Sequence, residues 1–161
     1  MSLSEQVITD TVPGITNLRR IESTVACAGA TTPAAMKAVK DMGFACVVNL
    51  RQVSEEEANV EAESAAAASA GLRYIHLPMD SASPDREVFD RFIDASRVPE
   101  NQPMFVYCRS GNRSAAMWLV KRIVVDGWTV ARALEEADAL GLRSEPLKQF
   151  ALDYAKLRPA R

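Results

Sequence analysis

Short apolar runs alternate with helical segments along this chain, and this alternation limits the possible folds more than any other feature. The run Phe44–Leu50 (FACVVNL) is apolar at consecutive positions, which is typical of a strand that is covered on both faces. Further strands are predicted within 16–28, at Leu72–Leu77 and at Pro103–Tyr107. Helices are predicted at about 33–42, 54–70, 114–125, 129–140 and 144–157, and one more begins at Pro84. The pattern predicts a three-layer α/β/α fold with a central, mostly parallel sheet.

Local signals mark the helix ends. Thr32 precedes a proline and is predicted to cap the first helix, which Gly43 ends. Ser54 and Glu57 have capping-box spacing and are predicted to open the second helix. Ser83, again before a proline, is predicted to cap the third. The glutamates at 55, 56, 57, 61 and 63 then form a solvated acidic face.

The composition is that of one ordinary domain. The 161 residues are 48% hydrophobic and 25% charged, so we expect a single domain over 1–161, with 1–13 as a peripheral or disordered segment. A net charge of −2 does not favour a nucleic-acid partner. The sequence shows neither an apolar run of the ~20 residues that a membrane helix needs nor a secretory signal, so we expect no membrane partner. The oligomeric state stays open.

The cysteines indicate a reducing compartment rather than a disulfide framework. Cys27, Cys46 and Cys108 are an odd number in a chain without a secretory signal, and we therefore expect a cytoplasmic protein. The cysteines are far apart and His76 is the only histidine, so a metal site is not expected.

The segment from Tyr107 to Ser114 (YCRSGNRS) carries the strongest functional signal. A strand ends, Cys108 follows it, and a turn containing glycine leads to Arg113 and a helix. Such a turn can aim backbone N–H groups into an anion site, to which the helix dipole and the Arg113 fork add positive charge. The same charges favour the thiolate form of Cys108, which makes it a candidate nucleophile. Residues 109–112 (Arg, Ser, Gly, Asn) would form the cradle with Arg113, and Ser114 is placed to donate to the sulfur.

This loop resembles the active-site loop of cysteine-dependent phosphatases and rhodaneses. Tyrosine and dual-specificity phosphatases have five residues between Cys and Arg, whereas this chain has the four of rhodaneses. The flanking segments Ala28–Thr32, Val47–Arg51 and Asp126–Leu134 resemble the bacterial dual-specificity-phosphatase-like family that is also found fused to β-lactamase-like hydrolases. Tyr107 stands where phosphatases usually place a histidine.

The resemblance implies phosphoester hydrolysis through a cysteinyl-phosphate intermediate, with no metal or organic cofactor. The substrate would be a phosphorylated small molecule or a phosphoprotein, protein phosphotyrosine among them. Such chemistry needs an acid for the leaving group. Asp80 matches the position of the phosphatase acid, and Asp85 is the runner-up, although its place near a helix start also suits a structural role.

Two other functions stay open. A rhodanese-like sulfurtransferase would carry a persulfide on Cys108 and would not need Asp80. A non-catalytic module would bind an oxyanion or sense thiol oxidation, with Cys27 as a resolving thiol if it lies close enough. Arg51 ends a strand at the same sheet edge as Cys108, where it can contact an anion or pair with Glu55 or Glu56.

Overall fold

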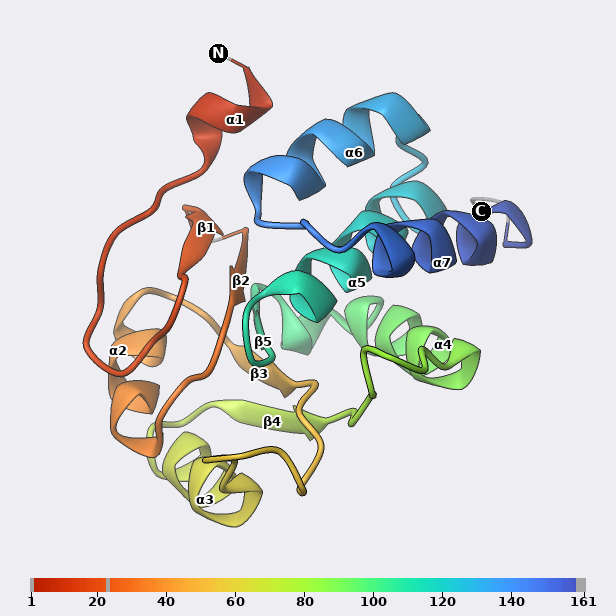
Figure 1. The fold of residues 1–161 in the computed structure, drawn as a ribbon. Helices are drawn as coiled ribbons and strands as arrows, with labels where there is room; N and C mark the ends of the chain where they lie inside the picture. Colours follow the sequence, from red (N-terminus) through yellow and green to blue (C-terminus); the bar gives the residue numbers. More distant parts are fainter. Residues whose placement is uncertain (1, 23, 159–161) are drawn as a thin grey trace.

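One sheet of five strands forms the centre of the computed structural model, which describes residues 2–22 and 24–158. The strands lie in the order β1-β2-β5-β3-β4 (Figure 1). Only the edge strand β1 pairs antiparallel to its neighbour, and the other pairings between these five strands are parallel. The strand bounds are Arg19–Ile21 (β1), Val25–Ala28 (β2), Cys46–Asn49 (β3), Arg73–His76 (β4) and Met104–Tyr107 (β5). The predicted fold class is confirmed.

Helices cover both faces of the sheet (Figure 1). One layer holds α2 and α3, and the other holds α4 to α7, with α5 packed against α4, α6 and α7. The helices are α1 (Leu3–Gln6), α2 (Met36–Asp41), α3 (Val60–Ser69), α4 (Arg86–Ser96), α5 (Asn112–Val124), α6 (Val130–Ala139) and α7 (Glu145–Lys156), with 3₁₀ turns at Pro33–Ala35 and Pro99–Asn101. No helix in the described part of the chain is both long and apolar enough to span a membrane.

The two faces of β5 serve different layers, because successive side chains of a strand point to opposite sides. Met104, Val106 and Cys108 belong to the core under α4–α7. Phe105 and Tyr107 belong to the core under α2 and α3. All four residues of β2, β3 and β5 are buried, which explains why these strands read as continuous apolar runs.

The strand register brings four loops to one edge of the sheet. Ala28 pairs with Tyr107, Tyr107 with Asn49, and Asn49 with His76, so these four residues form one row across the sheet. The loops that follow them therefore start level with one another. In open parallel sheets this carboxyl edge is where ligands bind.

Two predicted helix starts are wrong. The second helix begins at Val60 rather than near Ser54, and the Asn59 side chain caps it by accepting from the Ala62 N–H. Residues 51–59 form a loop instead, in which the Glu55 carboxylate pairs with the distant Arg113, as described below. The third helix begins at Arg86, and Asp85 rather than Ser83 caps it by accepting from the Glu87 N–H.

The N-terminal segment 2–13 packs on the outside of the sheet and helices. Its short helix α1 contacts α6, and Ile8 forms an antiparallel bridge with Arg20 of β1.

Candidate active site

The Cys108–Arg113 loop forms a closed turn at the carboxyl end of β5. Cys108 is fully buried, and its Sγ accepts a hydrogen bond from the Gly111 N–H at 3.1 Å. Gly111 has a φ of 105°, a left-handed conformation that favours glycine, and it leads directly into α5. The N-terminal N–H groups of α5 and the positive end of its dipole therefore lie at this loop. The arrangement stabilises negative charge on the sulfur.

Neighbouring backbone holds the loop from the β2 side. The Cys108 N–H donates to the Ala28 carbonyl at 3.1 Å, and the Ala30 N–H donates to the Arg109 carbonyl at 2.9 Å. A Cβ at Gly29 would lie 2.5 Å from the Arg109 carbonyl oxygen, so only glycine leaves room for this approach. The segment after β2 thus forms one wall of the loop.

Arg113 is buried and fixed by Glu55 from the loop after β3. Its Nη1 and Nη2 donate to the two Glu55 carboxylate oxygens at 2.7 and 2.8 Å. Nη1 also donates to the carbonyls of Leu50 and Met79, at 3.2 and 2.7 Å. These bonds use the Nη1–Nη2 edge of the guanidinium, which leaves the Nε–Nη2 edge for a second bidentate partner such as an oxyanion.

Electrostatics couple these groups. Burial disfavours the charged form of Glu55, but hydrogen bonds from Arg113 and the Gln52 N–H outweigh it and lower the pKa of Glu55 to about 2. Burial likewise opposes charge on Arg113, yet the hydrogen bond to Glu55 and the charge on Cys108 raise its pKa. Glu55 is thus an ionised anchor for Arg113. The sequence pattern predicted Glu55 on a solvated helix face, and that prediction is wrong.

Asp80 lies in the hollow that contains Arg113. This hollow has a volume of about 150 Å³ and is lined by Gln52, Glu55, Asp80, Ser81, Arg109 and Arg113. Asp80 is exposed, and its Oδ1 accepts from the Ala82 N–H at 2.9 Å, which orders the turn that carries it. The runner-up Asp85 instead caps α4. The structure therefore brings Asp80, and not Asp85, to the lining of this hollow.

The remaining predicted cradle residues have different surroundings. Arg109 is exposed and lines both this hollow and an adjoining one that includes Arg51. Asn112 accepts through Oδ1 from the N–H groups of Arg143 and Ser144 at 2.7 and 2.8 Å, and its Nδ2 lies 3.2 Å from the Ser110 hydroxyl. The Ser114 hydroxyl donates to the Ala28 carbonyl at 3.2 Å, and its predicted bond to the sulfur stays a prediction.

Tyr107, which precedes the cysteine, faces the opposite side of the sheet. Its hydroxyl donates to the buried carboxylate of Glu63 on α3. Glu63 also accepts from the Asn59 N–H at 2.7 Å. Burial and the bond to Glu63 raise the pKa of Tyr107 well above its ordinary value. Glu63 was predicted on a solvated acidic face, and its burial corrects that prediction.

Arg51 and His76 support the loop after β3. Arg51 is buried; its Nη2 donates to the Glu56 carbonyl at 2.6 Å, and its Nε lies 3.5 Å from Glu55 Oε1. His76 Nε2 contacts the Arg51 carbonyl at 2.6 Å. Arg51 thus pairs with Glu55, one of the two partners that the sequence left open.

The three cysteines are free thiols in the core. Cys27 shares a core cluster with Cys108, and burial above all raises the pKa of Cys27. Burial also raises the pKa of Cys46, to about 11. Both thiols are therefore held in the protonated form.

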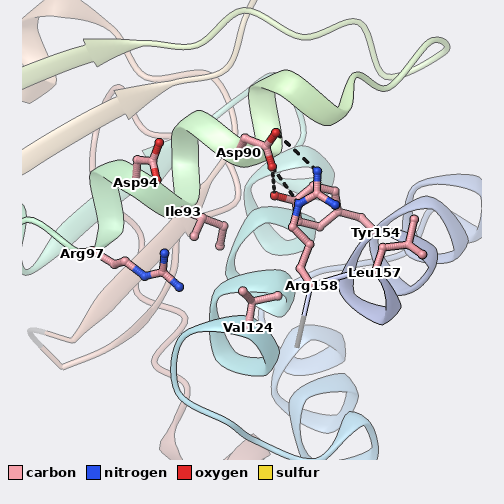
Figure 2. Close-up of a pocket in the computed structure, with 8 residues that line it drawn as sticks. All are labelled: Asp90, Ile93, Asp94, Arg97, Val124, Tyr154, Leu157 and Arg158. Carbon is pink, nitrogen blue, oxygen red and sulfur yellow. Dashed lines mark hydrogen bonds and ion pairs between the residues drawn. The ribbon is translucent and has the colours of Figure 1, made fainter. Parts of the chain in front are cut away.

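A wider hollow, of about 470 Å³, lies between α4, α7 and the end of α5 (Figure 2). Asp90, Tyr154 and Arg158 form a hydrogen-bonded group at its rim. Val124 lines it from the last turn of α5, whereas the cysteine loop precedes the first turn. At 1.5 Å per residue the helix separates the two by about 18 Å. This hollow is not part of the cysteine site.

The chain matches a known protein family over most of its length. Residues 17–125 match the family described as beta-lactamase hydrolase-like protein, phosphatase-like domain. No curated protein sequence matches the chain significantly.

Solved structures of phosphatase-related proteins share the fold. A DUF442 protein of Shewanella putrefaciens CN-32 has 21% identity and a TM-score of 0.75, with 92% of this chain and 96% of that chain covered. TpbA of P. aeruginosa has 22% identity and a TM-score of 0.67, covering 94% and 89%. The core catalytic domain of the PP-IP phosphatase SIW14 of S. cerevisiae has 13% identity and a TM-score of 0.69, covering 88% and 87%.

The family match spans β1 to β5, the loops at the carboxyl ends of the parallel strands and α5, which together carry the cysteine loop, Glu55 and Asp80. The chain therefore belongs to the phosphatase-like domain family of beta-lactamase hydrolase-like proteins.

Proposed function

We propose that the protein is a cysteine-dependent phosphatase that hydrolyses phosphoesters through a cysteinyl-phosphate intermediate. One observation carries this proposal: the Asp80 carboxylate shares a hollow with Arg113, the arginine of the cysteine loop. Arg113 then supplies an oxyanion-binding fork and Asp80 a proton donor, and the proposal adds the thiolate of Cys108, at the start of the same loop, as the nucleophile. A sulfurtransferase would need the nucleophile but not the proton donor, and an oxyanion-binding module would need only the cradle.

In the first step the Cys108 thiolate attacks phosphorus, and an S–P bond forms as the bond to the leaving oxygen breaks. Protonated Asp80 gives its proton to that oxygen. The N–H groups of the loop and the free edge of Arg113 hold the phosphoryl oxygens. In the second step the Asp80 carboxylate takes a proton from water, the water oxygen bonds phosphorus, and the S–P bond breaks to restore the thiolate. The Ser114 hydroxyl stabilises that thiolate by turning its proton from the Ala28 carbonyl to the sulfur.

The hollow suggests which phosphoesters can bind. Its described lining residues are polar or charged, and it is small. Recognition therefore rests on the phosphoryl group itself. TpbA has been solved with phosphotyrosine and SIW14 is a PP-IP phosphatase, so both a phosphotyrosine peptide and an inositol pyrophosphate are reasonable test substrates.

The test compares two leaving groups in four proteins. Wild type, Cys108→Ser, Asp80→Asn and Asp85→Asn are assayed with an activated aryl phosphate and with an alkyl phosphate, whose leaving oxygen is more basic. We expect Cys108→Ser to abolish phosphate release, and wild type to show a phosphate adduct on Cys108 by intact mass. Asp80→Asn should lose about 10²–10⁴-fold with the alkyl ester and less with the aryl ester, because only a poor leaving group needs the proton.

Asp85→Asn is the matched control, since it changes an aspartate in the same loop region that caps α4. Equal losses in Asp80→Asn and Asp85→Asn would contradict the acid assignment. Thiocyanate formation from thiosulfate and cyanide that ignores Asp80→Asn would replace the proposal with sulfur transfer. Tight phosphate binding without turnover of any ester would replace it with a binding module.

A further inference from the structure

The peptide groups of the cysteine loop are held from outside, and one of the holding groups is a side chain. Asn17, in the segment before β1, donates from Nδ2 to the Ser110 carbonyl oxygen at 3.1 Å. Asn17 is 93 residues away from Ser110 in the sequence, and the family resemblance did not mark it.

The bond fixes the direction of the next N–H. In a planar trans peptide, the carbonyl and the N–H of the following residue point in opposite directions. Asn17 binds the Ser110 carbonyl on the outer side, so the Gly111 N–H of the same peptide points inward. That N–H donates to Cys108 Sγ at 3.1 Å. Asn17 and the sulfur thus hold the two ends of one peptide.

The preceding peptide is held in the same way. The Ala30 N–H donates to the Arg109 carbonyl at 2.9 Å, which turns the Ser110 N–H in the opposite direction. Here the donor is backbone, and no substitution can remove it selectively. The Ser110–Gly111 peptide depends instead on a side-chain amide, so its orientation can be tested by mutation.

Asn17 itself is placed by backbone contacts. The Thr16 N–H donates to the Ala30 carbonyl at 2.9 Å, and the Gly29 N–H donates to the Thr16 carbonyl at 2.7 Å. Ile15 and Leu18 are buried on either side of this segment. Asn17 has a φ of 49°, a left-handed conformation that asparagine tolerates better than most residues. These contacts fix the backbone at Asn17, and its side-chain amide reaches the cysteine loop from there.

We propose that Asn17 is a positioning residue for the Cys108 thiolate, acting through the Ser110–Gly111 peptide. The inference rests on the proposed function, because a positioned thiolate matters for a nucleophile. Loss of the amide frees the Ser110 carbonyl to turn inward, where its negative end would replace the Gly111 N–H beside the sulfur. The thiolate would then lose a donor and face an acceptor.

The experiment measures thiolate formation directly, without turnover. The ultraviolet absorbance of the thiolate is followed against pH in each variant, with the Cys108→Ser form of the same variant subtracted. Asn17→Gly keeps the left-handed backbone and removes the amide. Asn17→Asp keeps the shape and replaces the donor with an acceptor. Glu22→Gly is the control, because Glu22 is also exposed and left-handed, with a φ of 41°.

The groups that face the sulfur from neighbouring elements are Arg113 of α5 and the protonated Cys27 of β2, and the variants change neither. We expect Asn17→Gly to raise the midpoint of thiolate formation by about half to one pH unit, which is a three- to tenfold loss of thiolate below the midpoint. Asn17→Asp should shift it further, since it also adds negative charge. The turnover number should fall in parallel, while KM changes little.

A wild-type midpoint in Asn17→Gly would overturn the proposal, as would an equal shift in Glu22→Gly. These results are independent of the proposed function. If wild type hydrolyses no phosphoester, the titration still shows whether Asn17 positions the thiolate. If it does hydrolyse one and the midpoint does not move, only the role of Asn17 is wrong.

Discussion

Two loops that leave the same edge of the sheet contribute to the candidate site, and they are held in different ways. The loop after β5 is fixed mainly by backbone hydrogen bonds to Ala28 and Ala30. The loop after β3 is fixed largely by charge, through Glu55 with Arg113 and Arg51. The backbone hydrogen bonds of the cysteine loop therefore do not depend on ionisation, whereas the contacts of the Glu55 loop do. The expected effects below run from large to small.

The largest effect is expected where backbone packs on backbone. Gly29→Ala would place a Cβ 2.5 Å from the Arg109 carbonyl oxygen, so the cysteine loop must move. We expect a loss of about 2–3 kcal/mol in the free energy of unfolding and a roughly hundredfold loss of phosphatase turnover. Denaturant unfolding and steady-state kinetics measure the two.

Gly111→Ala is the matched control for that substitution. The nearest atom to its added Cβ is 3.8 Å away, so the cost comes from the left-handed backbone alone, about 1–2 kcal/mol. The comparison fails if Gly111→Ala destabilises the protein as much as Gly29→Ala does.

The next largest effect is expected when the charge that holds the loop after β3 is removed. Glu55→Gln should lower the free energy of unfolding at neutral pH by about 1–3 kcal/mol, because a buried Arg113 loses an ionised partner. The pKa of Glu55 is lowered from 4.5 to about 2 on folding, so its contribution is complete above pH 4.5. The difference between wild type and Glu55→Gln should therefore shrink as the pH falls from 4.5 through about 2. Urea unfolding at several pH values measures this.

Glu56→Gln serves as the control, since that neighbouring side chain is exposed. It should change the free energy of unfolding by less than about 0.5 kcal/mol. A pH-independent difference between wild type and Glu55→Gln would mean that the loop is not held by charge.

The same distinction explains what could be predicted from the sequence. The strands, most helices and the Cys108 loop follow from local patterns: consecutive apolar residues, glycines, and a cysteine directly after a strand. The partners of Glu55, Glu63 and Asn17 lie between 44 and 93 residues away in the sequence. A local pattern carries no signal for such contacts. The capping-box spacing of Ser54 and Glu57 even favoured a helix. In the structure Glu55 forms an ion pair with Arg113 instead, and Glu57 takes a left-handed φ of 64°, which is outside the helical range.

A smaller effect is expected on the opposite face of β5. Tyr107→Phe removes the hydroxyl that donates to Glu63, and we expect a loss of about 1–2 kcal/mol in the free energy of unfolding. Turnover should change less than about threefold at temperatures where the protein stays folded, because the ring points away from Cys108. A much larger loss of turnover with unchanged stability would show that the two faces are coupled.

The smallest effect is expected in the outer hollow. The side chains of Asp90 and Arg158 are 46% and 33% exposed, so Asp90→Asn should cost less than about 1 kcal/mol. Turnover should equal that of wild type, since the hollow lies at the far end of α5 (Figure 2). A change in turnover at constant stability would indicate that α5 transmits changes along its length to the cysteine loop.

The side chain of Asn112 connects the cysteine loop to a part of the chain beyond the family match. Its oxygen binds two N–H groups at the start of α7, and α6 and α7 cover the apolar side of α5. The family match nevertheless ends at residue 125, before α6 begins. A fragment cut at that point would keep every proposed reacting group and lose the cover over the helix that presents them. The family match and the hydrophobic core around α5 therefore end at different places in this chain.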